Sequence, residues 1–184
     1  IKVVDVGGDH RFVEGWTYGL TELPGQREKI RKASRLANPG CYPAAALLAL
    51  APLVKEGLVE SERIVIDAKS GVTGTGRGGS SEFGYAETNE DLFAYGLESH
   101  PHVPEMEQAL EQVGGRKATI AFTPHLVPMT RGILATCYAR PRGAATAMYR
   151  WVTNLDVRSI LPAIRVPTLV LHRADARHHR AAFG

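Results

Sequence analysis

The sequence lacks several features that would assign it to common protein classes. Its longest strongly apolar run, 43–54, is too short to cross a bilayer. It opens with no basic-then-apolar signal segment, which gives no indication of secretion. Aromatic residues make up 7% of the chain and are not interleaved with cations, so a nucleic-acid surface is not indicated either. We therefore expect neither a membrane nor a nucleic acid as a partner.

Cysteine is scarce, since Cys41 and Cys137 are the only two. A small secreted domain held together by disulfides needs more cysteines than this. A reducing compartment suits the chain better, and we expect it to be cytoplasmic.

Lysine is absent from the last part of the chain. Residues 143–184 carry six Arg, two Asp and no Lys, for a net charge of +4, whereas residues 1–142 carry a net charge of −1. The overall composition is 44% hydrophobic and 22% charged, as in an ordinary globular protein. The basic character therefore belongs to the tail, and the change near residue 142 indicates a join between unrelated pieces.

The remaining pattern predicts alternating strands and helices. Apolar periodicity and Gly/Pro positions predict strands over 1–6, 63–69, 118–126 and 132–139, and helices over 26–35, 43–57 and 100–112. The helix over 43–57 is apolar on most sides, which predicts deep burial. Residues 127–131 predict a connection rather than a tight hairpin.

Cys41 follows the turn Pro39-Gly40 and stands at the entrance of this apolar helix. Unpaired N–H groups and the dipole at a helix N-terminus favour a thiolate, which is the nucleophilic form of cysteine. The alternative is a small buried apolar residue. Cys137 lies in the middle of a predicted strand, where nothing indicates reactivity.

His100 and His102 lie in a proline-flanked segment before a predicted helix. Either could act as general acid and base for a nearby cysteine. A structural role is the main alternative. A His-x-His pair also suits zinc, but the sequence shows no companion cluster of ligands, so we predict no metal site.

The glycine-rich segment 70–79 contains Gly-x-Gly-x-x-Gly at Gly74, Gly76 and Gly79, after a predicted strand. In a dinucleotide fingerprint this motif leads into a helix whose N-terminus binds the pyrophosphate. The residues that follow, 80–89, form a poor helix. The fingerprint interpretation is therefore rejected, although such a loop still lets a ligand approach the backbone.

Five separated motifs, in order, resemble the N-acetyl-gamma-glutamyl-phosphate reductase family. They are Asn38-Pro-Gly-Cys-Tyr-Pro43, Asp67-Ala-Lys-Ser-Gly-Val-Thr-Gly-Thr-Gly-Arg77, His100-Pro-His-Val-Pro-Glu105, Phe122-Thr-Pro-His-Leu-Val-Pro128 and Arg131-Gly-Ile-Leu-Ala-Thr136. The resemblance covers about residues 1–142. It implies an NADP-dependent oxidoreductase of arginine biosynthesis that acts on a small-molecule substrate as a homo-oligomer.

The resemblance also implies roles for individual residues. Cys41 matches the nucleophile and His102 the acid/base, with His100 beside the substrate. Arg77 and Arg131 are candidates to hold a substrate carboxylate or phosphate, with solvated or structural arginines as the alternative. The residues implied to lie beside the NADPH nicotinamide are Ser70, Gly71, Gly74 and Gly76.

The reaction implied is reduction through a Cys41 thioester. The thiolate displaces phosphate from N-acetyl-gamma-glutamyl phosphate, NADPH reduces the thioester, and N-acetylglutamate semialdehyde is released. A thiol suits this reaction because it both attacks and leaves readily.

Two departures from the family remain. The glycine-rich turn that should bind the NADPH pyrophosphate has no counterpart, so we expect impaired activity. Residues 155–173 instead resemble a segment of an α/β-hydrolase, with Asp175 near the place of its catalytic aspartate. No Gly-x-Ser-x-Gly motif supplies a serine nucleophile, so hydrolysis is not expected.

The expected architecture is α+β with three parts. Residues 1–40 should be a remnant of a doubly wound nucleotide-binding domain. Residues 41–142 should form a catalytic and oligomerisation domain with a mixed or antiparallel sheet, and residues 143–184 a tail of different origin. The alternative function is a non-catalytic binding or oligomerisation module, because an unfinished sheet leaves edges that pair with other chains.

Overall fold

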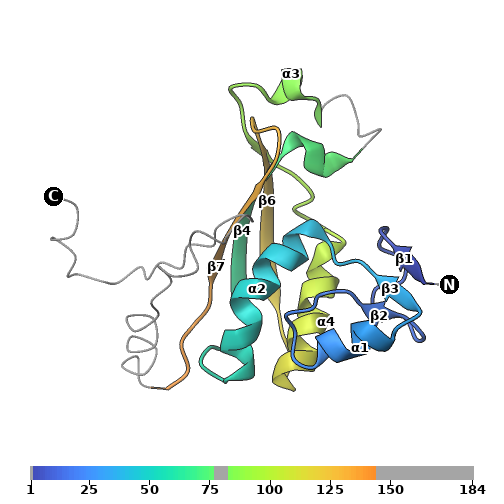
Figure 1. The fold of residues 1–184 in the computed structure, drawn as a ribbon. Coiled ribbons are helices and arrows are strands. Elements are labelled where there is room, and N and C mark those ends of the chain that lie inside the picture. Colours follow the sequence, from blue (N-terminus) through green and yellow to red (C-terminus); the bar gives the residue numbers. More distant parts are fainter. Residues whose placement is uncertain (1, 77–82, 144–184) are drawn as a thin grey trace, which may run out of the picture.

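The computed structural model describes residues 2–76 and 83–143, which form two sheets with helices packed against them (Figure 1). Arg77, the rest of the glycine-rich segment to 82, and the hydrolase-like tail lie outside the described residues. The elements are, in order, β1 (Val3–Asp5), β2 (Thr17–Tyr18), α1 (Gln26–Lys32), β3 (Arg35–Ala37), α2 (Cys41–Lys55), β4 (Ile64–Gly71), the 3-10 helix η1 (Val72–Thr75), α3 (Tyr85–Thr88), β5 (Phe93–Ala94), α4 (His102–Gly114), β6 (Ile120–Val127) and β7 (Ile133–Tyr138).

The first sheet has three short parallel strands in the order β1-β3-β2. Parallel strands joined by a helix are the arrangement expected of a doubly wound domain. The predicted helix over 26–35 is wrong at its C-terminal end, because α1 stops at Lys32 and Arg35 already pairs with Val3. Pairing with two neighbouring strands outweighs the helical propensity of this segment.

The second sheet has the order β5-β6-β4-β7 and is mixed. β4 pairs with β6 in parallel and with β7 in antiparallel orientation. The predicted α+β class with a mixed sheet is therefore confirmed. β6 and β7 are not neighbours, since β4 lies between them, so residues 128–132 connect across the end of β4 rather than forming a hairpin.

Two helices, α2 and α4, cover one face of the second sheet (Figure 1). α2 packs on α4 and β7, and α4 packs on β6. The largest buried aliphatic side chains of this core are Leu47, Leu50, Ile64, Ile66, Met106 and Leu110. Each contributes about 1.5–3 kcal/mol by leaving water, so this layer holds the two helix N-termini in place.

No helix among the residues that the structure describes has the length and hydropathy to cross a bilayer.

Candidate functional site

The N-termini of α2 and α4 touch each other. α2 begins at Cys41 and α4 at His102. A Cβ atom added to Gly40 would overlap the His102 ring at Nε2 and lie 2.9 Å from Glu105 Oε2. Only glycine fits before the cysteine, and the structure thereby places the residue next to Cys41 against the ring of His102, the residue that the resemblance implies as acid/base.

The start of α2 gives Cys41 an opening to solvent and nearby N–H groups. Gly40 is extended, with φ −62° and ψ 155°, and its carbonyl accepts the first helical hydrogen bond, from the N–H of Ala44, at 2.9 Å. Pro43 fits within the first turn, where its missing N–H costs no helical bond. Cys41 is a free, exposed cysteine, so a substrate can reach it.

Opposing influences act on the Cys41 thiol. Burial by the surrounding protein is the largest, and the net result is a pKa raised above its usual value. The backbone N–H groups of Tyr42 and Cys41 and the Arg11 guanidinium act in the opposite direction, and Glu105 raises the pKa further. The helix start favours the thiolate as the sequence predicted, but partial burial outweighs it in this structure.

His102 is held neutral at physiological pH. Its pKa is lowered to about 4, mainly by burial and to a smaller extent by His100 and Arg11. Its Nδ1 atom is buried and has no hydrogen-bond partner. A neutral imidazole can accept a proton, which is the form that general base catalysis requires.

His100 lies beside His102, with ring centroids 4.7 Å apart. The backbone N–H of His102 donates to Nδ1 of His100 at 3.1 Å, so the proton of a neutral His100 resides on Nε2. Burial lowers the pKa of His100 as well. Both rings pack edge-on against Tyr42, the residue that follows the cysteine.

Tyr42 and Tyr95 form a polar contact in this aromatic cluster. Their hydroxyls lie 3.0 Å apart, and the Tyr42 hydroxyl also donates to the carbonyl of His125 at 3.3 Å. Burial raises the pKa of both phenols, and the proximity of Cys41 raises each further. Tyr95 was not singled out from the sequence, where it is one aromatic residue in a segment without regular periodicity.

A buried carboxylate, Glu105, joins the two helix starts to the first forty residues. It is 4% exposed and accepts hydrogen bonds from Arg11 Nη1 at 2.7 Å, the Tyr18 hydroxyl at 2.7 Å and the Gly40 N–H at 2.8 Å. The sequence placed Glu105 within a motif but indicated no partner for it. Its partners are 94, 87 and 65 residues away in the chain, so no local pattern reveals them.

The residues expected beside a cofactor lie in the last two positions of β4 and in the segment that follows it. The hydroxyl of Ser70 is buried, and a Cβ on Gly74 would lie 2.5 Å from it. Gly71 faces the connection between β6 and β7, where a Cβ would come within 2.7 Å of the Met129 carbonyl oxygen. Gly76 is open, with φ +78° and no atom within 4 Å of an added Cβ. Of these four residues, only Gly76 offers both an open backbone and a glycine-specific conformation.

Of the two candidate anion-binding arginines, the structure describes Arg131 but not Arg77. Arg131 is exposed in the connection between β6 and β7, beside Gly71. Arg77 follows directly after Gly76 in the chain but lies outside the described residues. Within residues 2–76 and 83–143, no group of three His, Cys, Asp or Glu side chains gathers as metal ligands.

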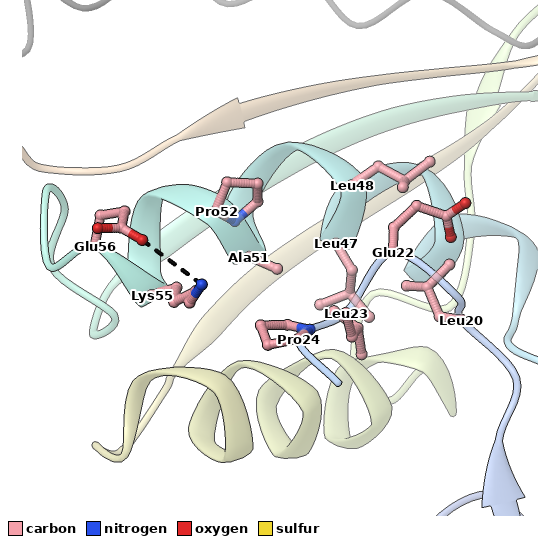
Figure 2. Close-up of a pocket in the computed structure, with 10 residues that line it drawn as sticks. All are labelled: Leu20, Glu22, Leu23, Pro24, Leu47, Leu48, Ala51, Pro52, Lys55 and Glu56. Carbon is pink, nitrogen blue, oxygen red and sulfur yellow. Dashed lines mark ion pairs between the residues drawn. The ribbon is translucent and has the colours of Figure 1, made fainter. Parts of the chain in front are cut away.

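A separate cavity of about 240 Å³ lies between α2 and the loop that follows β2 (Figure 2). It is mainly apolar, with an ion pair between Lys55 and Glu56 at 3.8 Å at one end. None of the predicted site residues lines it. Its lining residues are Leu20, Glu22, Leu23, Pro24, Leu47, Leu48, Ala51, Pro52, Lys55 and Glu56.

Solved structures of similar fold are aspartate semialdehyde dehydrogenases. One from Vibrio cholerae, titled as complexed with ASA, has a TM-score of 0.63 at 16% identity, covering 85% of this chain and 54% of that one. One from Candida albicans, titled as with NADP, has a TM-score of 0.56 at 12% identity, covering 82% and 48%. At these identities the likeness shows the fold alone.

Curated relatives carry the name expected from the motifs. N-acetyl-gamma-glutamyl-phosphate reductase of Bradyrhizobium sp. (strain ORS 278) is 58% identical over 146 residues, which are 79% of this chain and 44% of that protein. The protein of the same name from Desulforudis audaxviator is 50% identical over 159 residues, with 76% and 45% covered. The chain therefore spans a little under half the length of these relatives.

The predicted resemblance is confirmed by these relatives and by a family model. The model for the semialdehyde dehydrogenase dimerisation domain matches residues 41–155, more than half of the chain. Its first residue is the cysteine at the start of α2. On this match, the chain belongs to the semialdehyde dehydrogenase dimerisation-domain family.

Proposed function

We propose that this chain carries the thiol site of an NADPH-dependent reductase that converts N-acetyl-gamma-glutamyl phosphate to N-acetylglutamate semialdehyde. The observation that supports this most directly is the contact between the helix starts, where Gly40, the residue before the exposed Cys41, lies against the ring of a neutral His102. The name shared by the curated relatives supplies the substrate.

In the first half of the proposed reaction, His102 takes the proton of the Cys41 thiol. The sulfur attacks the acyl carbon, the carbon–oxygen bond to phosphate breaks, and phosphate leaves with its electron pair. A thioester on Cys41 results. The raised thiol pKa makes a proton acceptor necessary. His102 is unprotonated above a pH of about 4 but is a weak base, so the proton stays on sulfur at rest and is transferred only as the sulfur attacks.

NADPH, when bound, supplies the hydride that takes the thioester to the aldehyde level. The carbonyl oxygen takes its proton from His102, forming a thiohemiacetal. His102 then removes that hydroxyl proton again, the carbon–sulfur bond breaks, and Cys41 is released as a thiolate. His102 thus accepts one proton in each half of the reaction; it returns the first to the substrate oxygen and the second to the Cys41 thiolate, which restores the starting state.

The described residues fit only the reactive end of such a cofactor. Ser70 and Gly71 end β4 and Gly74 and Gly76 follow it, and the described residues leave the backbone of Gly76 open to the approach of a ring. We propose this segment as the nicotinamide side of the site.

Arg131, Arg77 and His100 are proposed to hold the substrate carboxylate or phosphate. We propose residues 1–40 as the cofactor side and 41–142 as part of the catalytic region. The unrelated tail expected over 143–184 is shortened, because the family match extends to residue 155.

The test is NADP-dependent phosphorolysis of N-acetylglutamate semialdehyde, followed by NADPH absorbance. Cys41→Ser should reduce the rate at least about a thousandfold, as loss of a covalent nucleophile does. Cys137→Ser is the matched control and should keep the rate within about twofold, because Cys137 is buried in β7. Activity that survives Cys41→Ser would contradict the proposed chemistry.

Self-association is a second proposed function, supported by the outer face of the second sheet. The side chains of Val65, Leu134 and Tyr138 are 41%, 41% and 48% exposed, and Val65 and Tyr138 face each other in register. The matched family is described as a dimerisation domain. We propose that a second copy of the chain covers this face.

Sedimentation velocity tests this assignment. The wild type should sediment as an oligomer, and Leu134→Asp should shift it to a monomer. Leu92→Asp serves as the control, because Leu92 is 59% exposed but lies outside the sheet. A monomeric wild type would contradict the second function without affecting the first.

A further inference from the structure

The buried carboxylate of Glu105 accepts hydrogen bonds from three of the first forty residues, Arg11, Tyr18 and Gly40. Arg11 and Tyr18 lie upstream of the matched family segment, which begins at residue 41. Both donate to Glu105, on α4, which also receives the N–H of Gly40. Gly40 is the residue directly before Cys41, so the carboxylate fixes the backbone from which the thiol projects.

The Arg11 guanidinium is fixed independently of Glu105. Nε donates to the Asn38 carbonyl at 2.9 Å and Nη2 to the Gly7 carbonyl at 2.7 Å. Its side chain is 13% exposed, against 3% for that of Glu105. Two backbone acceptors would therefore keep the cation in place if the carboxylate lost its charge.

We propose that Arg11 is the fixed counter-ion that allows the buried carboxylate of Glu105 to hold the Gly40 N–H while a thiolate forms beside it at Cys41. A carboxylate at this depth is costly without a partner and would also repel a thiolate forming nearby. Arg11 removes both penalties. The loop that carries Arg11 is then part of the thiol site, and this role rests on the proposed function of Cys41.

The charges around the thiol agree with this assignment. Arg11 lowers the pKa of Cys41 and Glu105 raises it, while the phenols of Tyr42 and Tyr95 also lie close enough to interact with it. His102 and His100 are neutral at physiological pH because burial lowers the pKa of each. Arg11 and Glu105 are thus the permanent charges that act on Cys41 among the described residues.

The experiment measures the rate of Cys41 alkylation by iodoacetamide against pH, in a Cys137→Ser background. Arg11→Gln leaves Glu105 uncompensated, so the profile should move to higher pH and the rate at pH 7 should fall about tenfold, the equivalent of one pKa unit. Glu105→Gln leaves Arg11 on its two backbone acceptors, so the rate at pH 7 should rise about threefold or more. The double variant should return to within about twofold of the parent.

The alkylation rates of Arg11→Gln and Glu105→Gln should change in opposite directions, which distinguishes a charge effect from a purely structural one. Loosening of the turn before Cys41 would move both single variants in the same direction. Arg11→Lys keeps the charge and should stay within about threefold of the parent. Glu14→Gln is the matched control, because Glu14 is exposed in the same loop and should leave the profile unchanged.

Shifts of the same sign in both single variants, or an unchanged profile in both, would overturn the proposal. Arg11→Gln could unfold the chain, which circular dichroism would reveal. In that case the test rests on Glu105→Gln and the double variant. An alkylation rate of Glu105→Gln at or below that of the parent would then overturn the proposal. Alkylation needs neither substrate nor cofactor. A failed reductase assay with the expected alkylation pattern would therefore contradict the proposed function alone.

Discussion

The start of α2 and the middle of β7 each hold one cysteine, and the two regions treat it differently. Burial raises the pKa of both thiols, and that of Cys137 rises to about 12 with burial as its only cause. At Cys41 the backbone N–H groups and Arg11 oppose the effect. The comparison shows that a helix start supplies what a strand centre does not: donors with no backbone partner and access from solvent.

The largest expected difference is in alkylation. Iodoacetamide at pH 7 should modify Cys41 more than about a hundredfold faster than Cys137, because Cys137 has almost no thiolate there and is buried. Peptide mass spectrometry after timed quenching measures both sites in one sample. Comparable rates in the folded chain would remove the distinction, and equal rates in denaturant are the control.

Gly40→Ala tests the close approach at the Cys41 end. The added Cβ would overlap the His102 ring and crowd Glu105, so the free energy of unfolding should fall by about 1–3 kcal/mol. Gly8→Ala is a matched control, because its Cβ would meet only Arg11 side-chain atoms at 3.6 Å or more. Urea denaturation measures both. An equal loss in the two variants would mean that the helix starts are not tightly apposed.

Replacing each cysteine by serine compares the two environments directly. Cys137→Ser should lower the free energy of unfolding by about 1–2 kcal/mol, because it buries a hydroxyl in the core. Cys41→Ser should change it by less than about 0.5 kcal/mol, since Cys41 is exposed. The order of the two effects is the prediction, and its reversal in thermal denaturation would contradict the burial described here.

His102 should also make the stability of the Cys41 end depend on pH, by an amount similar to the effect of Cys137→Ser. Its folded pKa of about 4 lies below the usual 6.5, so the unfolded chain binds more protons between these values. Stability should therefore fall as pH decreases from about 6.5 to 4, by about 1–2 kcal/mol after allowing for partial exposure. His102→Gln should flatten this part of the profile, with a His10→Gln variant, whose ring is more exposed, as the control.

The long elements, and the places of Cys41 and His102 at helix starts, could be predicted because their signals are local. A cysteine that follows Pro-Gly, and histidines that precede a helical pattern, are each predicted to lie at the start of a helix. β3 and β5 could not be predicted, since three- and two-residue strands exist only through their partners. Arg11 and Tyr18 were missed for the same reason: each acts on the site through a residue about ninety positions away.

The crossing of residues 128–132 over the end of β4 has a mechanical consequence. The N–H groups of Gly71, Val72 and Thr73 donate to the carbonyls of Gly132, Met129 and Thr130, at 2.9, 2.8 and 3.3 Å. The Thr73 hydroxyl adds a fourth bond to Thr130. These four hydrogen bonds join the two segments, so a displacement of the segment after β4 would be transmitted through residues 129–132 to β7, the edge strand on which α2 packs.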